Sequence, residues 1–164
     1  MGCDIHCCIE WRDTLKNKVN CIGLTAEANK SLVDINVKNY DSNFNSINDR
    51  IYNGRNYALF TILAGVRTRE PFMPISPRKG VSNDASYLFK SWIEEYGPDG
   101  HSASWLTLKE LQDFNWDQEV VSHYGNTYRE ASGNFQDTIE YMEEIRKERN
   151  LTSEDVRFCF FFDN

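Results

Sequence analysis

The first stretch of the chain, Cys3 to Arg12, alternates between apolar and polar residues, and it constrains the fold more than any other segment. Because successive side chains of a β-strand point to opposite faces, the alternation predicts a strand with one buried face and one polar face. Asp4 and His6 lie two residues apart and would point the same way from the polar face. We therefore expect a sheet built around this strand, with a candidate site at its polar edge.

The last stretch, Val156 to Asp163, has the same period of two. Its four even-numbered residues are Val or Phe and are expected to face the core, whereas Arg157, Cys159, Phe161 and Asp163 face the other way. The matched periods predict that the first and last strands are neighbours. We expect an α+β fold, with a mostly antiparallel sheet and helices packed on one face of it, in a single domain that spans residues 1–164.

The other elements follow from local spacing. Val19–Leu24 and Leu32–Tyr40 are expected to be strands, and Asp41–Gly54 is expected to be a long surface loop. Thr107 and Glu110 form the pattern of a capping box, which opens a short helix. Apolar residues at helical intervals predict three longer helices, over Tyr57–Val66, over Ala85–Tyr96 with Asp84 as its N-cap, and over Phe135–Asn150.

Composition narrows the class of partners. The formal net charge of -7 disfavours general binding to the phosphate backbone of nucleic acids. The chain has no apolar run of about 18 residues that would cross a membrane, and it does not open with the basic and then apolar segment of a signal peptide. The five cysteines are an odd number without C-x-x-C spacing, so we expect reduced thiols and a cytoplasmic location. Self-association into a homo-oligomer is left open.

Asp4 and His6 form the first candidate site. Such a pair can share a divalent metal ion, or His6 can act as a base that Asp4 orients. The alternative is a solvated outer face of an antiparallel sheet, where Asp and His are common. If the last strand runs antiparallel to the first, Asp163 approaches Asp4.

His101 is the second candidate, in a predicted loop from Asp99 to Trp105. With Ser102 and Ser104 it could bind a phosphate group or serve as acid or base. Trp105, Trp116 and Tyr124 could stack on a nucleobase, although core packing is the favoured alternative for each of them. The alternative is a histidine that satisfies backbone groups ahead of the capped helix. A Ser–His nucleophile pair is disfavoured, because there is no G-x-S-x-G turn and adjacent residues rarely point at each other. We predict that His101 converges with Asp4 and His6 on one pocket, with Asp163 at its rim.

Arg55, Arg67, Arg69 and Arg78 bracket the first predicted helix and the proline-rich segment after it. In an acidic protein, such a local group indicates a clamp for a carboxylate or phosphate group. The alternative is that these arginines pair with surface acids. The sequence contains neither G-x-x-x-x-G-K-[ST] nor G-x-G-x-x-G, so phosphate-binding loops of those two kinds are excluded.

Several blocks resemble one group of viral proteins. Proteins encoded by tailed phages and prophages open with the same Met-Gly-Cys-Asp-Ile-His, and the chain is similar to them at Asp99–Leu108, which reads Asp-Gly-His-Ser-x-Ser-Trp-Leu-Thr-Leu. It departs from them at Lys79, which lengthens a Pro-Arg-Gly loop. Further similar blocks are Arg55–Arg67, Pro77-Arg78, Asp84–Ser86 and Phe160–Asn164. The resemblance implies a viral or prophage setting. By analogy, small phage proteins often act against host defence, sometimes by sequestering or destroying nucleotide signals.

Three functions are consistent with these observations. The first is a protein that captures a small, anionic, nucleotide-like ligand through Arg55, Arg67, Arg78 and the His101 segment. The second is a hydrolase of the phosphodiesterase type, in which Asp4, His6, His101 and Asp163 could hold a divalent metal ion. The third is a module that binds a host protein through its surface. We rank capture above hydrolysis, because no compact metal motif such as H-E-x-x-H supports the second.

Overall fold

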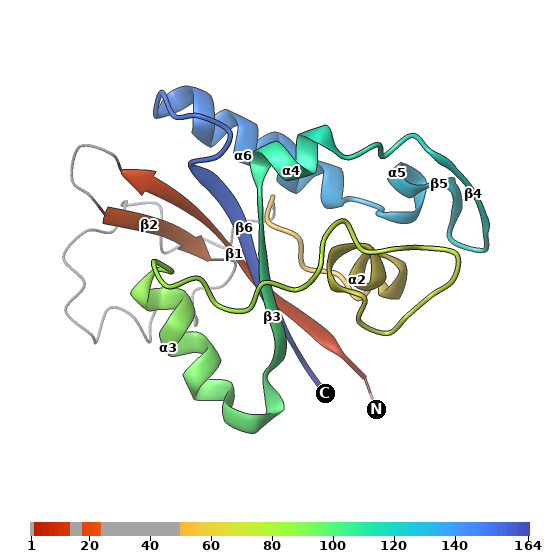
Figure 1. Ribbon diagram of the computed structural model, residues 1–164, viewed down its shortest axis with the longest axis horizontal. Coiled ribbons are helices and arrows are strands. Elements are labelled where there is room, and N and C mark those ends of the chain that lie inside the picture. The colour runs from red at the N-terminus through yellow and green to blue at the C-terminus, as the bar shows by residue number, and fades with distance from the viewer. Residues whose placement is uncertain (1, 14–17, 24–49) are drawn as a thin grey trace.

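The computed structural model describes residues 2–13, 18–23 and 50–164. Its main sheet has four strands in the order β2-β1-β6-β3, and each neighbouring pair is antiparallel. The first and last strands of the chain are therefore neighbours, as their matched periods predict. The two ends of the chain lie at the same end of the sheet (Figure 1). The strands are β1 (Asp4–Asp13), β2 (Lys18–Gly23), β3 (His101–Thr107) and β6 (Val156–Asp163).

Helices and a small hairpin surround this sheet. The predicted helices are confirmed, with ends that differ by a few residues. Among the described residues, no helix has the length and the apolar composition of a membrane span. The predicted strand Leu32–Tyr40 and most of the predicted loop Asp41–Gly54 lie outside the described residues. The remaining elements are α2 (Tyr57–Ala64), α3 (Tyr87–Tyr96), the short 3-10 turn η2 (Gly97–Asp99), α4 (Leu108–Asp113), β4 (Glu119–Ser122), β5 (Gly125–Thr127), α5 (Tyr128–Ala131) and α6 (Phe135–Glu148).

One face of the sheet carries the larger core. The odd-numbered residues at the start of β1 and the even-numbered residues of β6 pack there against α2, α4 and α6. Seven of the eight residues of α2 are buried, which fits its apolar sequence. This helix ends at Gly65, which has a positive φ of 66°. Helices commonly end at a residue in this left-handed region, and glycine adopts it without a steric penalty.

The opposite face is also buried, and this corrects the expectation of helices on one face and a polar second face. α3 packs its Leu88 and Phe89 on Cys8, Cys159 and Phe161. As a result, seven of the eight residues of β6 are buried, although only every second one was expected to be. The alternating sequence did not predict this second layer, because Cys8, Cys159 and Phe161 alternate with core residues and were assigned to the polar face.

The capping of α3 differs from the prediction. The N-cap is Ser86, whose hydroxyl accepts a hydrogen bond from the Phe89 amide, and Asp84 instead binds Arg157. The capping box of Thr107 and Glu110 is confirmed at the start of α4.

The segment that contains His101 is a strand and not the predicted loop. His101 and Ser104 pair with Phe162 and Phe160 of β6, and a register shift lies between the two pairs. The strand was not predicted because its sequence is polar. It can be polar because β3 lies at the edge of the sheet, where its partner β6 supplies most of the apolar surface.

Four cysteine side chains are described. Cys3, Cys7, Cys8 and Cys159 are buried thiols outside any disulfide, and the side chain of Cys21 lies outside the described residues. Burial raises the pKa of the Cys7 thiol far above its ordinary value. Its Sγ donates a hydrogen bond to the Tyr52 carbonyl at 3.1 Å.

Candidate functional site

The start of β1 and the end of β6 bring Asp4, His6 and Asp163 together. Asp4 lies directly opposite Asp163 in the strand register, so the predicted approach of these two residues is confirmed. The Asp163 carboxylate accepts two hydrogen bonds, one from the Asp4 backbone N–H at 3.1 Å and one from His6 Nε2 at 3.0 Å. Both of its oxygens are thereby fixed in position.

The His6 imidazole is held by aromatic rings on the α3 side of the sheet. It stacks on Phe161 at 4.9 Å between ring centroids, and Tyr96 and Trp92 lie at 4.3 and 5.5 Å. The His6 side chain is 16% exposed, so it reaches solvent. Within the described part of the chain, its Nδ1 has no hydrogen-bond partner. This histidine is oriented at one nitrogen and open at the other.

Asp4 turns its carboxylate toward Arg55. The Arg55 guanidinium donates from Nε and Nη2 to the two carboxylate oxygens at 2.8 and 2.7 Å, and this pairing lowers the pKa of Asp4. The interpretation of Arg55 as one half of a surface ion pair is therefore confirmed. Asp4 is not available to orient His6, and that role belongs to Asp163.

His101 does not join this group, so the prediction of one shared pocket is wrong. His101 pairs with Phe162 and stacks on its ring, whereas His6 pairs with Phe161 and stacks on that ring. Phe161 and Phe162 face opposite sides of the sheet and belong to different core clusters. The predicted metal-ligand set of Asp4, His6, His101 and Asp163 is not assembled for the same reason.

A second group of polar side chains lies at the start of β3, and we call Arg78, His101 and Ser102 the β3 cluster. Ser102 Oγ is 2.9 Å from His101 Nδ1 and accepts a hydrogen bond from Arg78 Nη1 at 2.6 Å. The expectation that adjacent His and Ser side chains avoid each other is wrong here. Ser102 has a positive φ of 56° at the register shift of β3, and this backbone turns its hydroxyl back onto His101.

Two further residues that were predicted to bind a ligand have structural partners. Ser104 Oγ accepts a hydrogen bond from the Lys79 backbone N–H at 3.0 Å, which ties the proline-rich segment to the sheet edge. The Trp105 ring lies under the Lys79 ammonium at 4.0 Å and under the Arg157 guanidinium at 5.6 Å. These cation–π contacts occupy the ring for which stacking on a base was one of two interpretations.

Arg67 also contacts the ends of the chain. Its Nη2 donates to the Gly2 carbonyl at 3.3 Å and to the Asn164 side chain at 3.5 Å. Arg55 and Arg67 thus hold the residues at the ends of β1 and β6, while Arg78 belongs to the β3 cluster. The three arginines do not act on one common partner, as a single clamp would.

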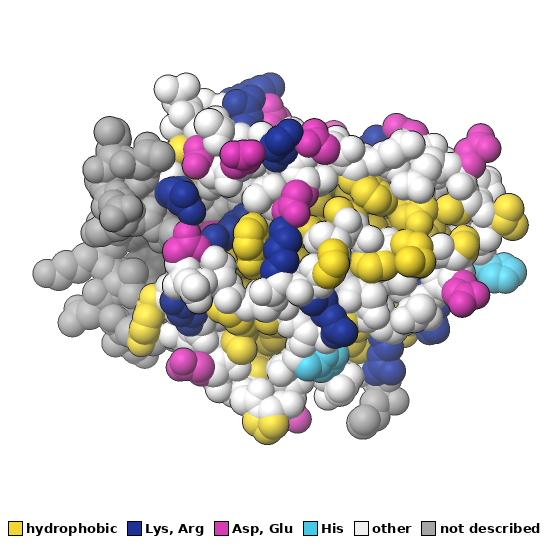
Figure 2. Space-filling model, viewed as in Figure 1, with side chains coloured by type: hydrophobic (Ala, Val, Ile, Leu, Met, Phe, Trp, Pro, Cys, Tyr) yellow, Lys and Arg dark blue, Asp and Glu magenta, His cyan; other side chains and the backbone are white. Residues whose placement is uncertain are grey.

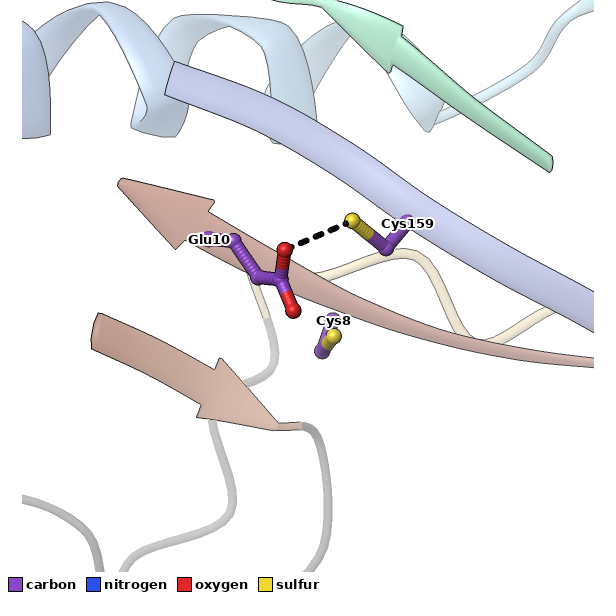
Figure 3. A group of neighbouring side chains, drawn as sticks. All are labelled: Cys8, Glu10 and Cys159. Atoms are coloured by element: carbon purple, nitrogen blue, oxygen red, sulfur yellow. Dashed lines mark hydrogen bonds between the residues drawn. The ribbon is translucent and has the colours of Figure 1, made fainter. Parts of the chain in front are cut away.

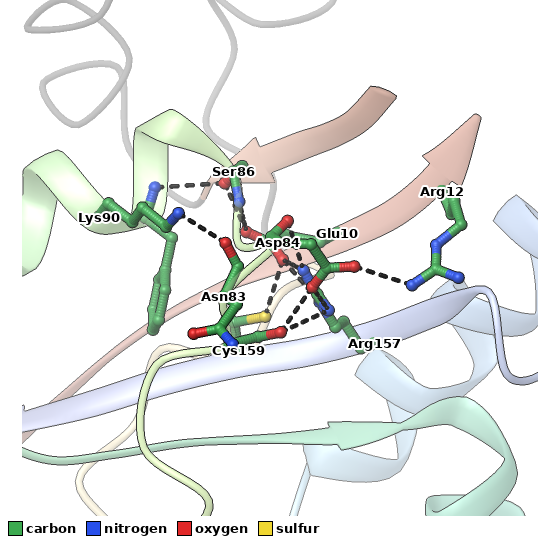
Figure 4. A network of polar contacts seen from close by, with 10 residues as sticks. Glu10, Arg12, Asn83, Asp84, Ser86, Lys90, Arg157 and Cys159 are labelled. Carbon is green, nitrogen blue, oxygen red and sulfur yellow. Dashed lines mark hydrogen bonds and ion pairs between the residues drawn. The ribbon is translucent and has the colours of Figure 1, made fainter. Parts of the chain in front are cut away.

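Sequence reasoning missed a buried polar network under α3 (Figure 4). Glu10 is fully buried, and Arg157 Nε donates to one of its carboxylate oxygens at 2.7 Å. The other oxygen accepts from the Ser86 backbone N–H at 2.8 Å and from its hydroxyl at 2.5 Å. Asp84 accepts from Arg157 Nη1 at 2.8 Å. The signal was present, because Glu10 and Arg157 fall on the same face of two strands that were predicted to be neighbours.

This network contains the one trio of metal-type donor groups in the described part of the chain, Cys8, Glu10 and Cys159 (Figure 3). Their donor atoms lie within 4.8 Å of one another. Both Glu10 oxygens already accept hydrogen bonds, including one from the Cys159 thiol at 3.3 Å, and the Arg157 cation lies beside them. A cation would have to displace that arginine, so the trio fits a structural role better than a metal site.

Figure 2 shows the face of the molecule on which β3 lies, with acidic and basic side chains interspersed over it. In comparisons with known proteins, no family model, curated protein or solved structure matches the chain.

Proposed function

We propose that the protein binds a small anionic, nucleotide-like ligand at the β3 cluster. The observation that carries this proposal is the state of His101: its Nε2 is buried and, in the described part of the chain, is the one buried side-chain nitrogen or oxygen without a hydrogen-bond partner. An unpaired buried polar group costs about 1–3 kcal/mol, so it is commonly a place where a ligand or water belongs.

The contacts of Ser102 support Nε2 as a donor. Arg78 can only donate, so Ser102 Oγ accepts from it, and we infer that Ser102 gives its own hydroxyl hydrogen to the nearby Nδ1 of His101. An imidazole whose Nδ1 accepts carries its hydrogen on Nε2. The group that completes this arrangement is therefore an acceptor, such as a phosphate or carboxylate oxygen.

The charge around the β3 cluster also favours an anion. Arg78 is exposed and, among the described residues, has no carboxylate partner, in contrast to Arg55. A guanidinium that is not neutralised by an acid is suited to bidentate binding of phosphate. Because Nε2 is closed off from solvent, binding requires a neighbouring side chain to move, and we propose that this is Arg78, which contacts the adjacent Ser102.

The resemblance to phage proteins makes a nucleotide signal of bacterial defence, met in the host cytoplasm, the first ligand to test. Calorimetric titration with inorganic phosphate, adenosine monophosphate and a cyclic dinucleotide would measure binding. Arg78→Gln should weaken binding of the best of these at least tenfold, since a hydrogen bond to a charged group contributes about 1.5–3 kcal/mol. His101→Gln should weaken it as well.

The matched control is Arg69→Gln, which removes another exposed arginine that contacts the Tyr57 ring and no carboxylate in the described residues. It should bind like the wild type. Inorganic phosphate or adenosine monophosphate that is released by heating should be chemically unchanged if the protein captures without turnover. Equal affinity of the wild type and Arg78→Gln, or no binding of any of the three probes by the wild type, would contradict the proposal and favour a surface that binds a host protein.

A further inference from the structure

We propose that His6 is a general base on the opposite face of the sheet, positioned by Asp163, and that it activates water to hydrolyse a phosphodiester with an aromatic substituent. This second site is independent of the anion site proposed at the β3 cluster. It rests on the orientation of one imidazole, on the open nitrogen of that ring and on the groups beside it.

The orientation of the base is fixed by Asp163. A carboxylate only accepts hydrogen bonds, so the contact at 3.0 Å places a hydrogen on His6 Nε2. The neutral ring then carries its lone pair on Nδ1, the nitrogen without a hydrogen-bond partner among the described residues. A base held in the correct tautomer by a third group is the arrangement that general-base catalysis requires.

The position of the His6 ring is fixed by its neighbours, as its tautomer is. Phe161, Tyr96 and Trp92 surround the imidazole, and Asp163 is itself tied to the Asp4 backbone. A histidine with a purely structural role would be expected to use both of its nitrogens, because polar atoms that are held in place are commonly paired. Here only one nitrogen is used, and the side chain reaches solvent.

The neighbouring groups indicate the class of substrate. Arg55 binds Asp4 through Nε and Nη2, which leaves the N–H groups of Nη1 directed away from that carboxylate. They can donate to a phosphate oxygen at the same end of the sheet. Trp92 and Tyr96 are partly exposed and offer ring surface to an aromatic substituent such as a nucleobase.

The proposed reaction needs no reactant besides water. His6 Nδ1 takes a proton from the water molecule as its oxygen forms a bond to phosphorus. The bond between phosphorus and the leaving oxygen breaks, and that oxygen departs with the electron pair. The imidazolium returns the proton to the leaving group or to solvent, and the products are a phosphomonoester and an alcohol.

The test uses the full chain and bis(p-nitrophenyl) phosphate, with release of p-nitrophenolate as the readout. General-base catalysis contributes about 10²–10⁴-fold, so His6→Gln should lower kcat/KM at least 100-fold. Asp163→Asn should lower it by less, because the base remains but its tautomer is no longer fixed. The matched control is His123→Gln, at an exposed histidine between β4 and β5, and it should keep wild-type turnover.

Rescue of turnover by added imidazole distinguishes a catalytic His6 from a structural one. His6→Ala should regain turnover as imidazole is added, whereas Asp163→Asn should not. The proposal is overturned if the wild type releases no p-nitrophenolate above buffer, if His6→Gln matches the wild type, or if imidazole leaves a folded His6→Ala variant inactive. The two proposals fail separately, because His6→Gln should still bind the calorimetric probes of the β3 cluster.

Discussion

Glu10 on β1 and Arg157 on β6 lie opposite one another in the antiparallel register, and their side chains form an ion pair of 2.7 Å beneath α3. Glu10 is fully buried and the Arg157 side chain is 10% exposed. Ser86 also donates to Glu10, and Asp84 accepts from Arg157. Such a network helps to hold α3 on the sheet, and the loss of Glu10 or Arg157 would leave the other charge buried without its main partner.

The first prediction is that breaking this pair destabilises the protein strongly. Glu10→Ala should lower the free energy of unfolding by about 3–5 kcal/mol, since Arg157 then lacks its main buried counter-charge. Urea denaturation followed by circular dichroism would measure the change. The control is Arg12→Gln, which breaks an exposed pair with Asp84 at 2.8 Å and should cost less than about 1 kcal/mol. Equal effects of the two variants would contradict the structural role of the buried pair.

The second prediction concerns acid. Hydrogen bonds from Ser82 and then from Arg157 hold the pKa of Asp84 well below its ordinary value of 3.8. A carboxyl group with a lowered pKa in the folded state contributes stability above its unfolded pKa, and the contribution falls as the pH drops below that value. The stability difference between the wild type and Asp84→Asn should thus be constant near neutral pH and shrink progressively below about pH 3.8. A difference that stays constant down to pH 2.5 would refute the linkage.

The sequence predicts which strands are neighbours better than it predicts which faces of the sheet are covered by helices. The period of two in the first and last strands was enough to pair them and to place Asp163 beside Asp4. It could not show that α3 covers the second face, because Cys8, Glu10, Arg157 and Cys159 look like a solvated row until their partners are known. Burial of a charge depends on the counter-charge, which is a property of tertiary structure and not of spacing.

The sequence predicted several residues of the candidate site, but it did not predict which of their side chains contact one another. Asp4 and His6 do lie on one face, but Asp163 and not Asp4 contacts the imidazole. His101 was assigned to the wrong side, since a polar edge strand was taken for a loop and its register could not be derived. The contact of His101 with Ser102 depends on a backbone angle that no residue type in the sequence specifies.

The third prediction concerns the thiols. In a Cys21→Ser variant, the four remaining cysteines are those with buried side chains, Cys3, Cys7, Cys8 and Cys159. They should react with Ellman's reagent only on unfolding, because a thiolate must be exposed to attack. Four thiols should titrate in guanidinium chloride without reductant. Fast reaction of the native protein, or fewer than four thiols after unfolding, would contradict the burial or the absence of a disulfide in this part of the chain.

The last prediction tests the backbone that positions the β3 cluster. Ser102 has a φ of 56°, in the left-handed region that glycine adopts readily and that costs other residues about 1–2 kcal/mol. Ser102→Gly and Ser102→Ala both remove the hydroxyl, so both should weaken anion binding. Their stabilities should differ, with the glycine variant more stable by about 1 kcal/mol in urea denaturation.

The control for this pair is Ser91, which lies inside α3. There the order of stabilities should reverse, since glycine is less favourable than alanine within a helix by about 1 kcal/mol. A stability order with alanine above glycine at both positions would show that Ser102 is not held in the left-handed region. The backbone of Ser102 would then not turn Oγ toward His101, and Nε2 of His101 would not be fixed as the donor to an anion.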